Sequence, residues 1–308
     1  MGEYRSRFVG RRYRRSRQLR SKSRAVVSVV GTLLAMLVFL SLFGVFINEW
    51  LPLWMTDNEA QFTAQTQSSL AELKSNMDLQ IALGAPPVYA TPFTMASSGV
   101  PVLAQPTAGV LNFVPASPGV FANVSMTPGP GGANTFFQNV SLGTLTMSLP
   151  NRYYSPQLFE FENDAVIQSQ TSTQQLVMYP PGLSLNVSGN QVGVTMVLVQ
   201  MLGNATQAVS TGTQEVYSHF LFNQTFSSTV ASPTLSAKLF LGTHFPCAWS
   251  GFMKKAFQNA GLGGHATITP ANCVTSSKAS DITIAFTGLT SFNLVLAEFS
   301  IVVGVGVE

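Results

Sequence analysis

The longest apolar run in the chain lies close to its N-terminus. Residues 25–47 read AVVSVVGTLLAMLVFLSLFGVFI, without a single ionisable side chain. As an α-helix this run would be ~34 Å long, which is enough to cross the hydrocarbon core of a bilayer. A buried core helix is the alternative, but core helices are seldom apolar on every face over such a length. The pattern therefore predicts a transmembrane helix.

A second helical pattern follows the apolar run. Apolar or small residues recur there at three- and four-residue spacing, namely Phe62, Thr66, Leu70, Leu73, Met77 and Ile81. Pro52 is expected to interrupt the helix between the two patterns, Asp57 or Asn58 to cap the second one, and Gly84 to end it. Because the apolar stripe is narrow, we expect this helix to pack on its own domain or on another copy of itself.

The remainder of the chain, from Val88 to Glu308, has short runs of Val, Phe, Thr and Leu separated by Gly, Pro, Asn and Ser, which is typical of a β-domain. The strongest strand candidates are 191–201, 283–287 and 292–307, with a break at 128–132 and one further helix over 248–259. The predicted fold class is mainly β, a sandwich-like domain with an N-terminal transmembrane helix extended by a helical stalk. The predicted organisation is a basic tail 1–24, the transmembrane helix 25–47, the stalk 48–84 and the β-rich domain 88–308.

One predicted strand changes its alternation. Val140 and Leu142 share one parity, whereas Leu145, Met147 and Leu149 share the other. Since side chains alternate between the two faces of a strand, this change predicts a β-bulge near Gly143-Thr144.

Charge is distributed very unevenly between the two sides of the apolar run. Ten of the sixteen Lys and Arg residues precede residue 25, and twelve of the thirteen acidic residues follow the run. The positive-inside rule therefore predicts a single-pass protein with a cytoplasmic N-terminus and an extracellular C-terminal domain. A cleaved secretory signal would have a shorter apolar core, and Trp50 and Trp54 fit interfacial anchors of a spanning helix. A nucleic-acid-binding arm is another interpretation of the Arg-rich tail, but its position directly before the apolar run favours membrane lipid as the partner, and no nucleic acid is expected.

The start of the apolar run resembles a known family. The stretch Arg24-Ala25-Val26-Val27-Ser28-Val29-Val30-Gly31-Thr32-Leu33-Leu34 resembles the start of archaeal type IV pilin-like proteins, which carry a class III signal peptide. The resemblance implies cleavage between Arg24 and Ala25 by a membrane peptidase. Residues 151–170 look like a segment of uncharacterised archaeal envelope proteins with the same N-terminal helix. Val29 stands where many bacterial pilins have Glu, and Pro52 departs from a smooth filament core.

The only two cysteines, Cys247 and Cys273, lie in the predicted extracellular part, where oxidising conditions favour a disulfide. Such a bridge would contribute ~3–4 kcal/mol. Two alternatives are free thiols and a zinc site made with His244 and His265, although that spacing matches no standard zinc pattern. We therefore predict the disulfide and no metal or other cofactor. Five Asn-x-Ser/Thr sequons allow glycosylation, at Asn123, Asn139, Asn186, Asn204 and Asn223.

The acidic residues Glu160, Glu162 and Asp164 lie close together in the sequence, and Glu160 and Glu162 would share one face of a strand. A calcium site or a hydrolytic carboxylate pair is conceivable, but a solvated acidic edge or turn is the expected structure. The chain has no Gly-x-Ser-x-Gly, phosphate-loop, dinucleotide or His-Glu-x-x-His motif.

These patterns together predict a non-enzymatic, pilin-like protein of the cell surface. Its apolar helix would anchor it in the cell membrane and assemble with copies of itself into filaments, or with other envelope proteins, for adhesion. The alternative is a monomeric membrane-tethered binding or receptor-like module, and a membrane-bound hydrolase is a third interpretation.

Overall fold

The computed structural model describes residues 12–84, 87–129, 135–170, 174–270 and 280–304. The chain divides into two compact units, Met1–Trp54 and Met55–Glu308, and we call the second unit the β-domain. The helical elements are α1 (Arg12–Val45), the π-helical turn η1 (Phe46–Trp50), α2 (Leu51–Leu83) and α3 (Pro246–Asn259). The strands are β1 (Tyr89–Thr94), β2 (Val110–Val114), β3 (Phe121–Thr127), β4 (Thr135–Ser141), β5 (Thr144–Leu149), β6 (Gln157–Glu162), β7 (Ala165–Ser169), β8 (Gln175–Tyr179), β9 (Leu183–Ser188), β10 (Gln191–Leu202), β11 (Thr206–Val209), β12 (Thr213–Thr229), β13 (Leu235–Thr243), β14 (Ala266–Thr269), β15 (Ser280–Leu289) and β16 (Ser291–Gly304).

Helical backbone continues through Pro52, so the prediction that this proline interrupts the helix was wrong. Proline has no N–H to donate and its ring crowds the carbonyl four residues earlier. The π-helical turn η1 lies just before it, where the Leu51 N–H bonds to the carbonyl of Phe46, five residues earlier. In a π-helical turn the N–H groups bond to carbonyls five residues earlier instead of four. This change of partners just before the proline allows the helix to continue past it. Asp57 and Asn58 therefore both lie inside α2, so neither caps its start, whereas Gly84 follows the end of α2, as predicted, with a φ of 62°.

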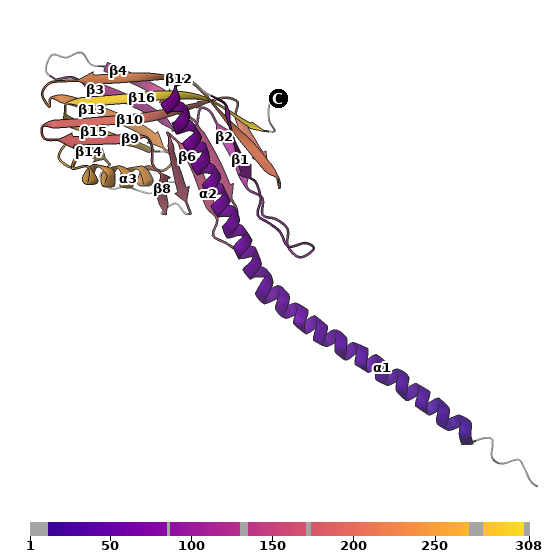
Figure 1. Ribbon diagram of the computed structural model, residues 1–308. Coiled ribbons are helices and arrows are strands. Elements are labelled where there is room, and N and C mark those ends of the chain that lie inside the picture. The colour runs from indigo at the N-terminus through magenta and orange to yellow at the C-terminus, as the bar shows by residue number, and fades with distance from the viewer. Residues whose placement is uncertain (1–11, 85–86, 130–134, 171–173, 271–279, 305–308) are drawn as a thin grey trace, which may run out of the picture. The chain divides into compact units, whose positions relative to one another are not determined.

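From Met55 onward α2 belongs to the β-domain, and it packs on the strands of that domain with one face. The predicted apolar stripe is buried at Phe62, Thr66, Leu70, Leu73 and Met77. These side chains, apart from Thr66, belong to one hydrophobic cluster with residues of β2, β5, β6, β10, β12 and β16, which we call the α2 core. Figure 1 shows α2 running over these strands. The alternative that this face of α2 is reserved for a second copy of the chain therefore finds no support, because the β-domain already covers it.

The described strands form three sheets. The first sheet has the order β1-β12-β16-β10-β9, the second β11-β2-β5-β6-β7-β8 and the third β14-β15-β13-β3-β4. Neighbouring strands are antiparallel except for β10 and β16, which run parallel. Mainly β structure with a long N-terminal helix is thus confirmed, and so are the strands predicted over residues 191–201 and 283–287 and the helix predicted over 248–259.

A second hydrophobic cluster, the α3 core, lies around Trp249, Met253 and Phe257 of α3 and is shared with strands of all three sheets. The strand β10 contributes to both cores by alternation. Val192, Val194, Met196 and Leu198 face the α3 core, whereas Val199 and Met201 face the α2 core. The strand β10 therefore packs against apolar side chains on both faces, which is what its dense apolar composition requires.

The predicted bulge near Gly143 is instead a change of sheet. The strand β4, ending at Ser141, belongs to the third sheet, and β5, starting at Thr144, belongs to the second. Leu142 faces the α3 core and Leu145 the α2 core, which explains the change of parity. Gly143 makes the crossing with a φ of 74°, and a Cβ atom there would lie 2.8 Å from the carbonyl oxygen of Met201. Only glycine fits both constraints.

Candidate functional site

The chemically distinctive part of the β-domain is the segment that contains β6. Phe159 and Phe161 point into the α2 core, so the alternate positions Glu160 and Glu162 point to the other side of the second sheet. Both carboxylates are buried, with 3% and 1% of their surface exposed. The prediction of a solvated acidic edge was therefore wrong. Its physical reason is that their partners come from β13 and α3, more than eighty residues away in the sequence.

His244, directly after β13, completes this cluster. Ligand atoms of Glu160, Glu162 and His244 all lie within 4.8 Å of one another. His244 Nδ1 lies 2.8 Å from Glu160 Oε1, and His244 Nε2 lies 3.2 Å from the carbonyl oxygen of Pro118. The side chain of His244 is 33% exposed, so solvent reaches the cluster from this side. We call these three residues the Glu-His cluster.

Two donors hold the Glu162 carboxylate. The Trp249 indole Nε1–H donates to Oε1 over 2.6 Å, and the Thr243 hydroxyl donates to the same oxygen. Thr243 is itself oriented by the backbone N–H of Phe245, 2.9 Å from its Oγ1. The other oxygen of Glu162, Oε2, is buried and has no hydrogen-bond partner among the described residues. The carboxylate is thus fixed in orientation with one oxygen left for a further ligand.

The environment shifts the pKa values of the cluster upward. Burial, followed by the neighbouring negative charge of Glu160, raises the pKa of Glu162 to about 8. The hydrogen bond to Glu160 raises the pKa of His244 to about 9, against the opposing effect of burial. At neutral pH the cluster therefore retains protons that the same groups would release in an unfolded chain.

This retention predicts a loss of stability at alkaline pH. A group whose pKa is higher in the folded state stabilises the fold below its unfolded pKa and ceases to do so as the pH rises through its folded pKa. His244 and Glu162 both have raised pKa values, so the free energy of unfolding is expected to fall from about pH 4.5 to about pH 9, and His244 contributes only above about pH 6.5. Urea unfolding of the full chain in detergent, followed by near-ultraviolet circular dichroism at several pH values, measures this slope. The variant His244→Gln is expected to reduce the slope above about pH 6.5, while the contribution of Glu162 remains, and an unchanged slope would contradict the assignment to this cluster.

Asp164 is the third acidic residue of the segment, and it lies in a different buried site. With Asn163 it forms the two-residue turn between β6 and β7, and both residues have positive φ values, 48° and 63°. Its Oδ1 accepts from Lys74 Nζ of α2 over 3.0 Å, and its Oδ2 accepts from the Gly182 N–H over 2.6 Å. Lys74 also bonds to Asp78, 2.9 Å away on the same helix. Burial raises the pKa of Asp164 to about 7, although the Lys74 ammonium opposes this shift.

A fourth buried carboxylate, Glu59 of α2, was not singled out from the sequence. Its oxygens accept from the backbone N–H groups of Arg152, Tyr153 and Tyr154 at 2.7–3.1 Å and from the Thr107 hydroxyl at 2.7 Å. Burial raises the pKa of Glu59, but these hydrogen bonds outweigh it and hold the pKa below its ordinary value. No local sequence signal marks this site, because its donors are three main-chain groups about ninety residues away and one hydroxyl 48 residues away.

The other sequence-predicted residues are distributed as follows. Arg24 and Ala25 lie within α1, so the predicted cleavage point is inside a helix. Cys247, in the first turn of α3, is not a free cysteine. Cys273 lies outside the described residues, so the disulfide stays a prediction. His265 Nδ1 lies 3.0 Å from the Thr287 carbonyl oxygen.

The sequons differ in their accessibility. Asn186, Asn204 and Asn223 are exposed, Asn123 is half-buried in β3, and the side chain of Asn139 lies outside the described residues. Glycosylation at all five sites stays a prediction, and the first three have the accessibility that it requires.

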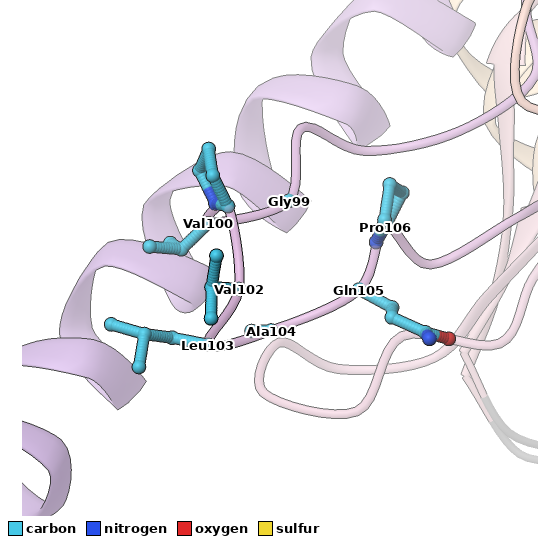
Figure 2. A pocket seen from close by; sticks show the side chains of 8 residues that line it. Gly99, Val100, Val102, Leu103, Ala104, Gln105 and Pro106 are labelled. Atoms are coloured by element: carbon cyan, nitrogen blue, oxygen red, sulfur yellow. The ribbon is translucent and has the colours of Figure 1, made fainter.

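A pocket away from these carboxylates is formed by a single loop. Residues 99–106 line a volume of about 570 Å³ (Figure 2). The loop is closed by reciprocal backbone hydrogen bonds of 2.9 Å between Val100 and Ala104, and Val102 at its tip has a φ of 69°. None of its side chains is ionisable, so the pocket offers shape and apolar contact but no acid–base group.

Comparison of the chain with known protein families, with curated proteins and with solved structures gives no match. The resemblance to type IV pilin-like envelope proteins therefore rests on residues 24–34 and 151–170 alone.

Proposed function

We propose that this chain is a non-enzymatic, single-pass membrane-anchored surface protein whose apolar helix carries the β-domain. One observation supports this most strongly. Within the described residues, one helix near the N-terminus is long and apolar enough to cross a membrane, and its apolar window is not buried. From Val29 to Val45 the large apolar side chains are 39–67% exposed. Such a continuous apolar surface is unstable in water and stable in lipid.

The proposed orientation follows from charge. Ten basic residues lie before residue 25, and Glu49 is the first acidic residue after the apolar run. Basic residues are retained on the cytoplasmic side of a membrane, so the β-domain would be exported. Trp50 and Trp54 are 55% and 44% exposed, which suits side chains that rest among lipid headgroups.

Pilin-like assembly is the finer proposal. Helical residues continue along the chain from Arg12 to Leu83, so the apolar helix leads directly into the helix that packs on the β-domain. After cleavage between Arg24 and Ala25, copies of the apolar helix would pack together in a filament and present the β-domain for adhesion or for contacts with other envelope proteins.

The alternative is a tethered binding module that keeps its tail. Val88, Tyr217, His219, Ser300 and Val302 line a second pocket of about 460 Å³. Its mixture of aromatic, imidazole and hydroxyl groups suits a small polar ligand. Mature chains that begin at Ala25 would support assembly, and chains that retain the basic tail would support the tether.

Membrane insertion is tested with a single charge in the apolar helix. Leu37 is 65% exposed, and Leu37→Asp is expected to weaken insertion by about 3 kcal/mol and to lower the fraction of full-length chain that resists alkaline carbonate extraction. The matched control is Leu83→Asp, at a 58% exposed position at the end of α2. Equal extraction of the two variants and the wild type would contradict the proposed anchor.

A further inference from the structure

The Glu-His cluster has the composition and burial of a metal site. The ligand atoms of two carboxylates and one imidazole lie within 4.8 Å of one another. Both carboxylates are almost completely buried. Buried carboxylates are uncommon without a cationic partner, because the charged form loses its hydration. Among the ion pairs of the described residues, the only one that includes either carboxylate joins Glu160 to His244.

The hydrogen bonds of Glu162 point to a ligand. Its Oε1 already receives the Trp249 and Thr243 donors, whereas Oε2 is buried and has no partner among the described residues. A proton on Oε2 would find no acceptor among those residues, and a negative charge there would find no donor. A cation bound at Oε2 satisfies this oxygen without disturbing the other.

The contacts of His244 prepare one nitrogen for coordination. Its Nε2 lies 3.2 Å from the Pro118 carbonyl oxygen, which can only accept, so Nε2 carries a proton. Its Nδ1 lies 2.8 Å from Glu160 Oε1, a separation that requires a shared proton between them. A metal ion that replaces this shared proton would be bound by Nδ1 and by the carboxylate, while the Nε2–H contact fixes the ring orientation.

We propose that Glu160, Glu162 and His244 bind a first-row divalent transition-metal ion, with Zn²⁺ as the first candidate. The imidazole nitrogen favours this class of ion over Ca²⁺ and Mg²⁺, which take oxygen ligands in larger number. Thr243 and Trp249 orient the ligand Glu162, as outer-shell groups do in metal sites. Zinc bonds of about 2.0–2.2 Å place ligand atoms roughly 3.3–3.6 Å apart in a tetrahedron, so Nδ1 and Oε1, now 2.8 Å apart, must separate on binding.

The position of the cluster indicates what the ion does. Glu160 and Glu162 lie on β6 of the second sheet, and His244 directly follows β13 of the third sheet. The bound ion therefore joins two sheets across the α3 core and stabilises the β-domain. The partly exposed His244 leaves a path for the ion and for a water ligand. This proposal is independent of membrane anchoring, since every ligand belongs to the β-domain.

Zinc binding by the full chain tests the proposal. Tag-free protein in detergent, treated with chelator, is titrated with Zn²⁺ by calorimetry, and bound zinc is counted by elemental analysis after dialysis. We expect about one ion per chain, a higher unfolding temperature, and release of protons, so that affinity increases from pH 6.5 to 8. Glu162→Gln, which keeps the size of the side chain and the acceptor for Trp249, is expected to lower affinity by about 100-fold or more. No zinc binding by the wild type would overturn the proposal.

A control separates this site from the cysteine-containing alternative. His265→Ala removes a ligand of the set His244, Cys247, His265 and Cys273 but none of the Glu-His cluster, so it is expected to leave affinity unchanged. Loss of binding in His265→Ala with retention in Glu162→Gln would overturn the proposal. The visible spectrum of the Co²⁺-loaded wild type adds a test that depends on no variant. Nitrogen and oxygen ligands are expected to give no thiolate-to-cobalt charge-transfer band, and a strong band of that kind would assign the ion to the cysteines.

Discussion

Replacing Glu59 by alanine is expected to lower the free energy of unfolding of the β-domain by about 4 kcal/mol. The side chain is fully buried, and its carboxylate accepts from three consecutive backbone N–H groups, residues 152–154, and from Thr107. Hydrogen bonds to a charged group contribute about 1.5–3 kcal/mol each, with less than full additivity, and their loss leaves donors without an acceptor. Urea unfolding of the full chain in detergent at pH 7 measures the difference.

Glu72→Ala is the matched control for this substitution. Glu72 lies on the exposed face of α2, so its replacement is expected to change the free energy of unfolding by about 0.5 kcal/mol or less. The effect of Glu59 should also depend on pH. Because its pKa is lowered in the folded state, its stabilisation is present above the unfolded pKa and is lost as the pH falls through the folded value. A Glu59→Ala effect that is the same at pH 3 and pH 7 would contradict the role of the charged carboxylate.

The buried face of α2 and its end were predictable from the sequence, because both depend on residues only a few positions apart. Three- and four-residue spacing identified the buried face from Phe62 to Met77, and Gly84 identified its end. The rule that proline ends a helix failed at Pro52, since the π-helical turn before it accommodates the missing N–H. That turn depends on backbone pairing over five residues, for which the sequence contains no recognised signal.

The change in side-chain alternation at Gly143 could be seen in the sequence, but the structural cause of that change could not. The change from Leu142 to Leu145 was visible as a shift between two faces, and a bulge and a change of sheet produce the same shift. Only the pairing of β4 with β3 and of β5 with β2 and β6 separates the two interpretations. The pairing of β5 with β2 crosses two intervening strands in the sequence, so no single window encodes it.

The burial of the carboxylates was harder still to predict from the sequence, for the same reason. Composition suggests that Glu160, Glu162 and Asp164 face solvent, because buried acidic residues are rare without partners. Their partners are His244, Thr243 and Lys74, and each belongs to an element remote in the sequence. The short segment 152–164 thus meets α2 at Glu59 and again at Lys74, positions about 22 Å apart along a helix.

The contact between Lys74 and Asp164 predicts the other large effect on the free energy of unfolding. Lys74→Met is expected to lower the free energy of unfolding by about 3–5 kcal/mol at pH 8, because it leaves Asp164 buried without its cation. Asp164→Asn is expected to cost less, since Lys74 retains Asp78 and asparagine tolerates the positive φ of this turn. The double variant should be more stable than the sum of the single effects predicts, by about 2 kcal/mol or more.

The pH dependence of this cycle distinguishes a charge effect from lost packing. The raised pKa of Asp164, about 7, means that its carboxyl is largely protonated at pH 5 in the folded state, and removing the Lys74 ammonium can only raise it further. A neutral carboxyl needs no cation, so the cost of Lys74→Met should shrink from pH 8 to pH 5. Urea unfolding of the four chains at both pH values measures the coupling energy. A cost of Lys74→Met that is equal at the two pH values would assign its effect to the packing of the lysine stem against the second sheet, and the ion pair would then contribute little.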